Sequence, residues 1–101
     1  MYYVYVLISQ KTNKLYFGYT QDLRRRLAEH NEKKSEYSKS STPWNLVYYE
    51  AFASDKDARL REKQLKSFKS AYGYLKKRLK YSLSSFIEPK KRGEAKFGDE
   101  A

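Results

Sequence analysis

The amino-acid sequence predicts a single α+β domain, in which a small, mainly antiparallel three-stranded sheet is flanked by helices in the order β-β-α-β-α-α. Two β-branched and aromatic runs stand near the N-terminus, a third ends at residue 52, and the segments between and after them have helical periodicity. A chain of 101 residues has room for one modest core. We expect residues 1–82 to form this domain and residues 83–101 a disordered tail, because the sequence after Pro89 has no periodicity.

The first strand is expected at residues 2–8, which are apolar on both faces and therefore typical of a central strand covered on two sides. Residues 15–20 resume strand chemistry after a turn, so the two segments predict an antiparallel hairpin. Residues 45–52 predict the third strand.

The first helix follows the hairpin directly. Thr20 is expected to cap it, and it should run to about Lys34. Leu23 and Leu27 share one face and predict its buried stripe. Residues 35–43 are rich in serine and predict an exposed loop.

Two further helices are expected after the third strand. Ser54 followed by Asp57 resembles a capping box and predicts a helix that continues to about Phe68. Ser70 is expected to cap a third, strongly basic helix that runs through about Tyr81.

The charge balance points to the kind of partner. Lys and Arg number 22 against 12 Asp and Glu, which leaves a net charge of +10. Residues 55–80 hold ten basic and three acidic residues, so the positive field belongs to the folded part of the chain. Such a charge favours a polyanionic partner, of which nucleic acid is the main candidate.

Several classes of protein are excluded by what the sequence lacks. It has no cysteine, which rules out disulfides, thiolate metal sites and cysteine nucleophiles. No apolar run reaches the roughly 18 residues of a membrane span, and the first strand-like segment does not resemble a signal peptide. We therefore expect a cytoplasmic protein that does not enter a membrane.

Tyr5 and Tyr16 are expected to meet on the sheet. With a four-residue loop at Ser9–Thr12 they lie opposite each other, and any loop of even length leaves them on the same face. They are either a packed aromatic pair or two phenols of a polar site. Gly18 either lets a ligand or another backbone approach closely or marks a bulge.

Arg26 and His30 lie one helical turn apart on a shoulder of the leucine stripe. A guanidinium there can hold a phosphate through two parallel hydrogen bonds, and a neutral imidazole can position water or accept a proton. The structural alternative is an ion pair between Arg26 and Glu29 or Asp22, beside a histidine satisfied by backbone.

Glu62 lies between Ala58 and Leu65 on the helix face that should meet the core. A carboxylate in that place needs a partner. One candidate is a neighbouring base, Arg59 or Lys66, in an ordinary helical ion pair. The other is a hard divalent cation, which prefers oxygen ligands.

These positions together resemble the GIY-YIG nuclease superfamily. Tyr3-Val4-Tyr5 and Tyr16-Phe17-Gly18 stand in the places of the two signature tripeptides, Arg26 and His30 in the first helix, and Glu62 in the segment that carries the metal-binding glutamate. The resemblance covers residues 2–66. It is to the small stand-alone members of the uncharacterised endonuclease-like group, related to the N-terminal domain of the excision-repair nuclease.

The chain departs from the family pattern at three points. Tyr3 replaces the first signature glycine and Phe17 the middle isoleucine. The chain also has no obvious counterpart of the downstream asparagine of larger members.

The resemblance implies that one Mg²⁺ or Mn²⁺, held by Glu62, supports hydrolysis of a phosphodiester to a 5′-phosphate and a 3′-hydroxyl. Arg26 would then be the catalytic arginine. Tyr5 or Tyr16 would be the general base as a tyrosinate, with Tyr5 preferred, and the basic surroundings are expected to favour its ionisation. His30 would relay the proton.

The substrate implied is nucleic acid, DNA more than RNA, held through phosphate contacts that carry little sequence information. A binding module without turnover and a subunit completed by a protein partner are the alternatives. The residues expected to contact nucleic acid are Gly18, Arg25, Tyr37, Lys39, Lys63 and Lys66.

Overall fold

The computed structural model describes residues 1–32 and 42–86, which form three strands and four helices. The elements are β1 (Tyr2–Ser9), β2 (Leu15–Thr20), α1 (Leu23–Asn31), β3 (Trp44–Phe52), α2 (Asp55–Ser67), α3 (Lys69–Arg78) and α4 (Lys80–Ser84). The α+β class and the order of elements are as predicted, with α4 added at the end. In these two ranges, no helix has the length and apolar character needed to cross a membrane.

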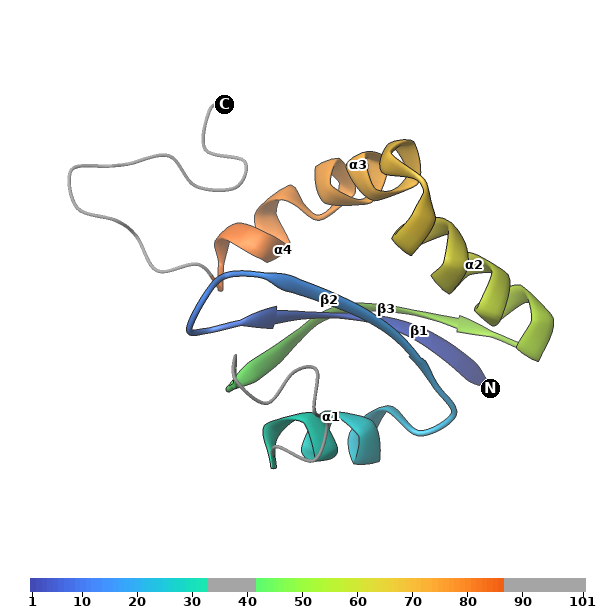
Figure 1. Ribbon diagram of the computed structural model, residues 1–101, viewed down its shortest axis with the longest axis horizontal. Helices are drawn as coiled ribbons and strands as arrows, with labels where there is room; N and C mark the ends of the chain where they lie inside the picture. Colours follow the sequence, from blue (N-terminus) through green and yellow to red (C-terminus); the bar gives the residue numbers. More distant parts are fainter. Residues whose placement is uncertain (33–41, 87–101) are drawn as a thin grey trace.

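The sheet has the order β2-β1-β3, and both pairs of strands are antiparallel. β1 is therefore the central strand, as its apolar sequence predicted. Figure 1 shows α1 on one face of the sheet and α2, α3 and α4 on the other. Residues 4–9 of β1 are all buried, because each face of this strand is covered by a different layer.

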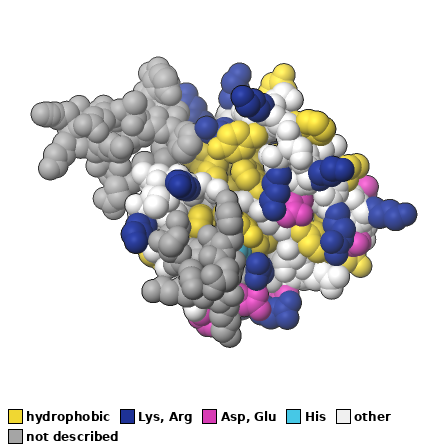
Figure 2. Space-filling model, viewed as in Figure 1, with side chains coloured by type: hydrophobic (Ala, Val, Ile, Leu, Met, Phe, Trp, Pro, Cys, Tyr) yellow, Lys and Arg dark blue, Asp and Glu magenta, His cyan; other side chains and the backbone are white. Residues whose placement is uncertain are grey.

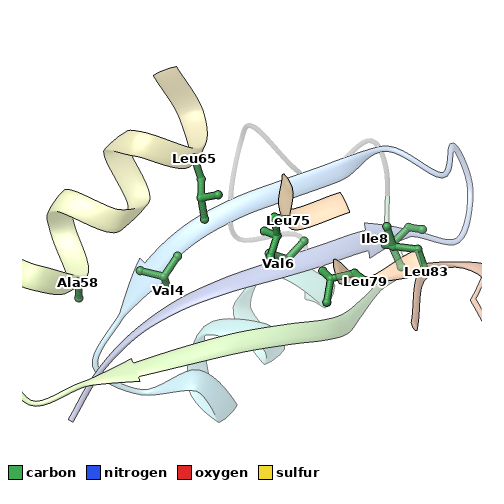
Figure 3. Close-up of a cluster of buried hydrophobic side chains, with 8 residues drawn as sticks. All are labelled: Val4, Val6, Ile8, Ala58, Leu65, Leu75, Leu79 and Leu83. Carbon is green, nitrogen blue, oxygen red and sulfur yellow. The ribbon is translucent and has the colours of Figure 1, made fainter. Parts of the chain in front are cut away.

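The larger core lies between the sheet and the C-terminal helices (Figure 3). Every second residue of β1 faces this layer, as the pleat of a strand requires. The buried members of the cluster are Val4, Val6, Ile8, Ala58, Leu65, Leu75, Leu79 and Leu83. The intervening residues Tyr5 and Leu7 point to the opposite face, where they form a second cluster with Trp44 under α1.

The hairpin register differs from the expected one. Leu7 pairs with Tyr16 and Tyr5 pairs with Gly18, so the loop is longer than the four residues considered above. Tyr16 therefore lies diagonally from Tyr5 instead of opposite it. Both still face α1, because the register is shifted by an even number of residues.

The first helix begins later and ends earlier than predicted. Asp22, not Thr20, is its N-cap, since the Asp22 side chain accepts a hydrogen bond from the Arg25 backbone N–H at 3.0 Å. Thr20 shapes the turn before the helix by accepting from the Asp22 N–H at 3.0 Å. The helix ends at Asn31, short of Lys34.

The expected cap of α2 is confirmed, since Ser54 accepts from the Asp57 N–H at 3.5 Å. Ser70 is not the cap of α3. It lies inside the first turn, and Phe68 takes the capping position without a side-chain hydrogen bond.

The chain stays in the core beyond the expected end of the third helix. α3 ends at Arg78, and α4 carries Leu83 into the core. The domain boundary expected after residue 82 thus falls inside α4. Residues 87–101, which hold most of the expected tail, lie outside the described residues.

Candidate active site

The candidate site is built on the face of the sheet that α1 covers. Tyr5 points into it from β1 and is 2 % exposed. Its ring lies over Gly18 of β2, and a Cβ added at Gly18 would overlap the phenol. The space that Gly18 leaves is therefore taken by the Tyr5 ring, which explains why a glycine stands inside a strand.

His30 comes to Tyr5 from the last turn of α1. It is fully buried, and its Nε2 lies 3.0 Å from the Tyr5 hydroxyl. The hydroxyl can donate this hydrogen bond when the imidazole carries its hydrogen on Nδ1. Leu23 and Leu27 are only half-buried, so the buried face of α1 is centred nearer to His30 than the leucine stripe predicted.

Burial shifts the pKa of both partners in the direction that favours the uncharged form of each. It lowers the pKa of His30 to about 4, and the positive charge of Arg26 acts in the same direction. It raises the pKa of Tyr5 to about 12, although Arg26 opposes this shift. The expectation that basic surroundings would favour a tyrosinate is wrong for the free protein, because desolvation outweighs the nearby cation. At neutral pH a protonated phenol faces a neutral imidazole.

Tyr16 completes an aromatic cluster beside this pair. Its ring stacks on Tyr5 with centroids 6.3 Å apart and meets His30 edge to face at 4.7 Å. Trp44 packs against Tyr16 at 5.9 Å. Unlike Tyr5, Tyr16 is half-buried, so part of this residue is open to solvent.

Arg26 forms the ion pair that the sequence offered as the structural alternative, and it also lies close to Tyr5. Its Nη1 donates to Glu29 at 2.9 Å, which is the expected ion pair. Its charge also reaches the Tyr5 phenol closely enough to lower that pKa. Because the Arg26 side chain is 32 % exposed, it can meet a ligand while Glu29 holds it beside the tyrosine.

Glu62 forms the ion pair with Lys66 that helical spacing predicted, at 3.0 Å, whereas Arg59 pairs with Asp55. Ala58 is buried on the same stripe, but the Glu62 side chain is 24 % exposed, so this carboxylate lies at the rim of the core and not within it. Its charge raises the pKa of Tyr5, which places it near the aromatic cluster.

A metal ion would find a sparse but suitable donor set here. No group of three His, Cys, Asp or Glu side chains that could hold a metal occurs within 1–32 and 42–86. Mg²⁺ commonly binds through one or two carboxylates, several waters and a substrate phosphate. Glu62 fits that pattern, since it is partly exposed and its partner Lys66 is a flexible side chain, 50 % exposed, that can turn away.

Sequence reasoning missed the residues that hold α1 against the sheet. The Asn31 side chain accepts from the Trp44 backbone N–H at 2.6 Å and donates to the Trp44 carbonyl at 3.0 Å. This double contact fixes the end of the helix next to His30. Trp44, the single tryptophan of the chain, is a signal that could have pointed to this place, but the third strand was expected to begin only at residue 45.

The residues expected to bind nucleic acid are scattered. Arg25 and Lys63 are exposed, and Lys66 lies with its Nζ 5.9 Å from the centroid of the Tyr16 ring. Tyr37 and Lys39 lie outside the described residues. Figure 2 shows that Lys and Arg side chains are spread over the face in view, several of them next to acidic side chains.

The sheet tyrosine Tyr5 is held by the helix histidine His30, and the charges of Arg26 and Glu62 act on the same tyrosine. A sequence model described as the GIY-YIG catalytic domain matches residues 1–78. The chain therefore belongs to the GIY-YIG family, as its two tripeptides predicted, and this is a nuclease family that acts on nucleic acid.

The particular proteins it is similar to are small UPF0213 proteins. One from Staphylococcus haemolyticus is 43 % identical over 68 residues, which is 66 % of this chain and 82 % of that protein. One from Haloquadratum walsbyi is 38 % identical over 68 residues, covering 66 % and 75 %. The solution NMR structure of a UPF0213 protein from Bacillus halodurans matches with a TM-score of 0.51 and 31 % identity, covering 84 % of this chain and 95 % of that one.

Proposed function

We propose that this protein hydrolyses phosphodiester bonds of nucleic acid with one Mg²⁺ or Mn²⁺, and that it selects DNA by structure more than by sequence. The observation that carries the proposal is the 3.0 Å contact between the Tyr5 hydroxyl and His30 Nε2, with Arg26 beside it. A hydroxyl next to a neutral imidazole is a pair suited to move one proton.

Tyr5 and His30 would act as a proton relay. As water attacks phosphorus, its proton passes to the Tyr5 oxygen while the Tyr5 proton passes to His30 Nε2. This concerted transfer needs no free tyrosinate, which agrees with a Tyr5 pKa of about 12. The low pKa of His30 keeps the imidazole neutral at neutral pH, so that Nε2 can accept a proton.

Arg26 and Glu62 would serve the phosphate. Arg26 keeps N–H donors beyond the one given to Glu29, and these can hold a non-bridging oxygen. A divalent cation on Glu62 would supply Lewis acidity at the phosphate and at the leaving oxygen. Tyr16, partly open to solvent beside Tyr5, would position the phosphate or the water.

The test is cleavage of labelled duplex, single-stranded, flap and branched DNA and RNA in the presence of Mg²⁺ or Mn²⁺. We expect nicking that stops with EDTA and with Glu62→Ala. Asp57→Ala, an exposed carboxylate on the same helix, is the control and should cut normally. Circular dichroism checks that both variants fold. Cleavage that survives both EDTA and Glu62→Ala would reject the proposal.

A nucleic-acid-binding module without turnover is the second candidate. It is favoured by the Lys66 ammonium already paired with Glu62 and by the net charge of +10. Binding that weakens with salt, together with no cleavage of any substrate in the panel, would select this function.

A further inference from the structure

A groove of about 580 Å³ opens along the edge of the sheet, between β2 and the junction of α2 and α3. Tyr16 belongs both to this groove and to the aromatic cluster of the candidate site. Lys66 also lines the groove, and Glu62 is its ion-pair partner. The groove is therefore continuous with the place where we propose that a phosphate is held.

The walls of the groove are aromatic. Phe17 and Tyr72 meet edge to face with centroids 5.4 Å apart. Phe68, at the junction of the helices, lines the groove with 57 % of its surface exposed. An exposed phenylalanine next to a packed aromatic pair leaves ring surface on which a planar ligand can stack. Figure 2 shows hydrophobic surface between α3 and β2, bordered by basic side chains.

The charges of the groove have one sign. Lys66 and Lys69 line it, and no acidic side chain is among the described residues that do so. Within the described parts of the chain, Lys69 forms no ion pair. Aromatic surface with ammonium groups at its rim matches a nucleotide, whose base stacks and whose phosphate is negative.

We propose that this groove holds one unpaired nucleotide of the substrate, next to the phosphate at Tyr5 and Tyr16. Its base stacks on Phe68 and Tyr72, and Lys69 contacts its backbone. The proposal rests on the proposed function and adds the class of substrate: DNA or RNA with at least one unpaired base beside the cut. A paired base does not enter, because both of its faces are already stacked in the duplex.

The test measures binding of the full chain in EDTA, so that no strand is cut. One oligonucleotide is offered as a full duplex and as a duplex with an unpaired extension, with the fluorescent base 2-aminopurine in the extension. We expect the unpaired form to bind more tightly and its fluorescence to be quenched by stacking. Phe68→Ala should weaken this binding about tenfold and abolish the quenching, but change duplex binding less than about twofold.

Tyr81→Ala is the matched control, since Tyr81 is an aromatic residue on α4 that is 77 % exposed and lies outside the groove. It should bind both forms like the unaltered protein. Equal affinities of Phe68→Ala and Tyr81→Ala for every oligonucleotide would overturn the proposal and leave the groove to a protein side chain. Loss of affinity for duplex and unpaired forms alike would overturn it too.

The outcomes separate this inference from the proposed function. If Phe68→Ala loses affinity for the unpaired form alone but Mg²⁺ and Mn²⁺ support no cleavage, the nucleotide groove is supported and the proposed nuclease activity is rejected. If the protein cuts DNA and Phe68→Ala cuts and binds as well as Tyr81→Ala, the activity stands and the groove falls.

Discussion

The hydrogen bond between Tyr5 and His30 joins the centre of the sheet to the buried face of α1. Each partner is uncharged at neutral pH because burial disfavours its charged form. For Tyr5, the opposing effect of the Arg26 charge is smaller than the effect of burial. The contact therefore contributes to folding as a neutral hydrogen bond. Because His30 is neutral, its Nε2 can also accept a proton.

His30 makes stability depend on acidity. Its pKa is about 4 in the folded chain and about 6.5 when unfolded, so the unfolded state binds more protons between these values. Stability from this group is complete above pH 6.5 and is lost as pH falls toward 4. Between pH 7 and pH 4, we expect the free energy of unfolding measured in urea to fall by about 1–3 kcal/mol more in the unaltered protein than in the variant His30→Gln. Parallel pH curves for the two proteins would contradict this.

Gly18 and Gly73 offer a matched pair of substitutions. Gly18→Ala should destabilise the protein by about 1–3 kcal/mol, because the new methyl group overlaps the Tyr5 phenol. It should also slow cleavage by displacing Tyr5 from His30. Gly73→Ala meets no atom within 4 Å and lies in α3, so it should stabilise by about 0.5–1 kcal/mol. Thermal unfolding measures both, and an equal change in the two variants would refute this account of Gly18.

At the scale of elements, α1 is a short helix that depends on its contacts for position. Its N-terminus is capped by Asp22, and its C-terminus is held to β3 by the Asn31 side chain. Because a helix of nine residues is marginal by itself, these contacts and the burial of His30 keep it on the sheet. The position of His30 in the candidate site therefore depends on the contacts that hold α1 against the sheet.

α4 closes the larger core from the C-terminal side. Leu83 is fully buried against the sheet layer, whereas Tyr81 on the same helix is 77 % exposed. We expect Leu83→Ala to lower the free energy of unfolding by about 2–5 kcal/mol. Tyr81→Ala should change it by less than about 0.5 kcal/mol. Similar effects of the two changes in urea denaturation would mean that α4 is not part of the cooperative unit.

At the scale of the molecule, the candidate site and the groove meet at one edge strand of the sheet. β2 is an edge strand, and Tyr16 on it borders both places. Lys66 and Lys69 line the groove at this edge. If a strand of nucleic acid binds as proposed, these two side chains are the basic groups closest to its path between the two places.

Binding of nucleic acid should be strongly sensitive to salt if phosphate contacts hold it, as proposed. Raising salt from 50 to 200 mM should weaken binding about tenfold or more, as fluorescence anisotropy would show. Lys69→Gln should reduce the slope of log affinity against log salt by about 1. Lys56→Gln, at the far end of α2, is the control. An affinity that is unchanged over this range would contradict an electrostatic grip.

The fold was predictable because its signals are local. A continuous apolar run at residues 2–8 indicated the buried strand, which the structure extends to Ser9, and Ser54 indicated the start of α2. The start of α1 was misplaced because Thr20 and Asp22, two residues apart, are both good N-cap residues. The hairpin register was missed because six residues connect the last pair of the hairpin, Ile8 and Leu15, and a loop of that length does not dictate one pairing.

The candidate site was predictable in membership and not in state. Residue types and spacing placed Tyr5, Tyr16, Arg26, His30 and Glu62 in one family pattern, which depends on sequence alone. The ion pairs of Arg26 with Glu29 and of Glu62 with Lys66 were among the alternatives, because they join neighbours on one helix. The role of Gly18 under Tyr5 was not, since it depends on how two strands are paired.

The sequence by itself determined the family and the order of the first six elements, and it supplied the residues from which the candidate site is proposed, because periodicity and spacing can be read along the chain. Only the tertiary structure decided that Tyr5 and His30 meet at 3.0 Å, that burial keeps both uncharged, and that aromatic residues of β2, α2 and α3 enclose a groove. The reason is that burial and contact arise between segments far apart in the chain, where the free energy of desolvation depends on everything packed around a group.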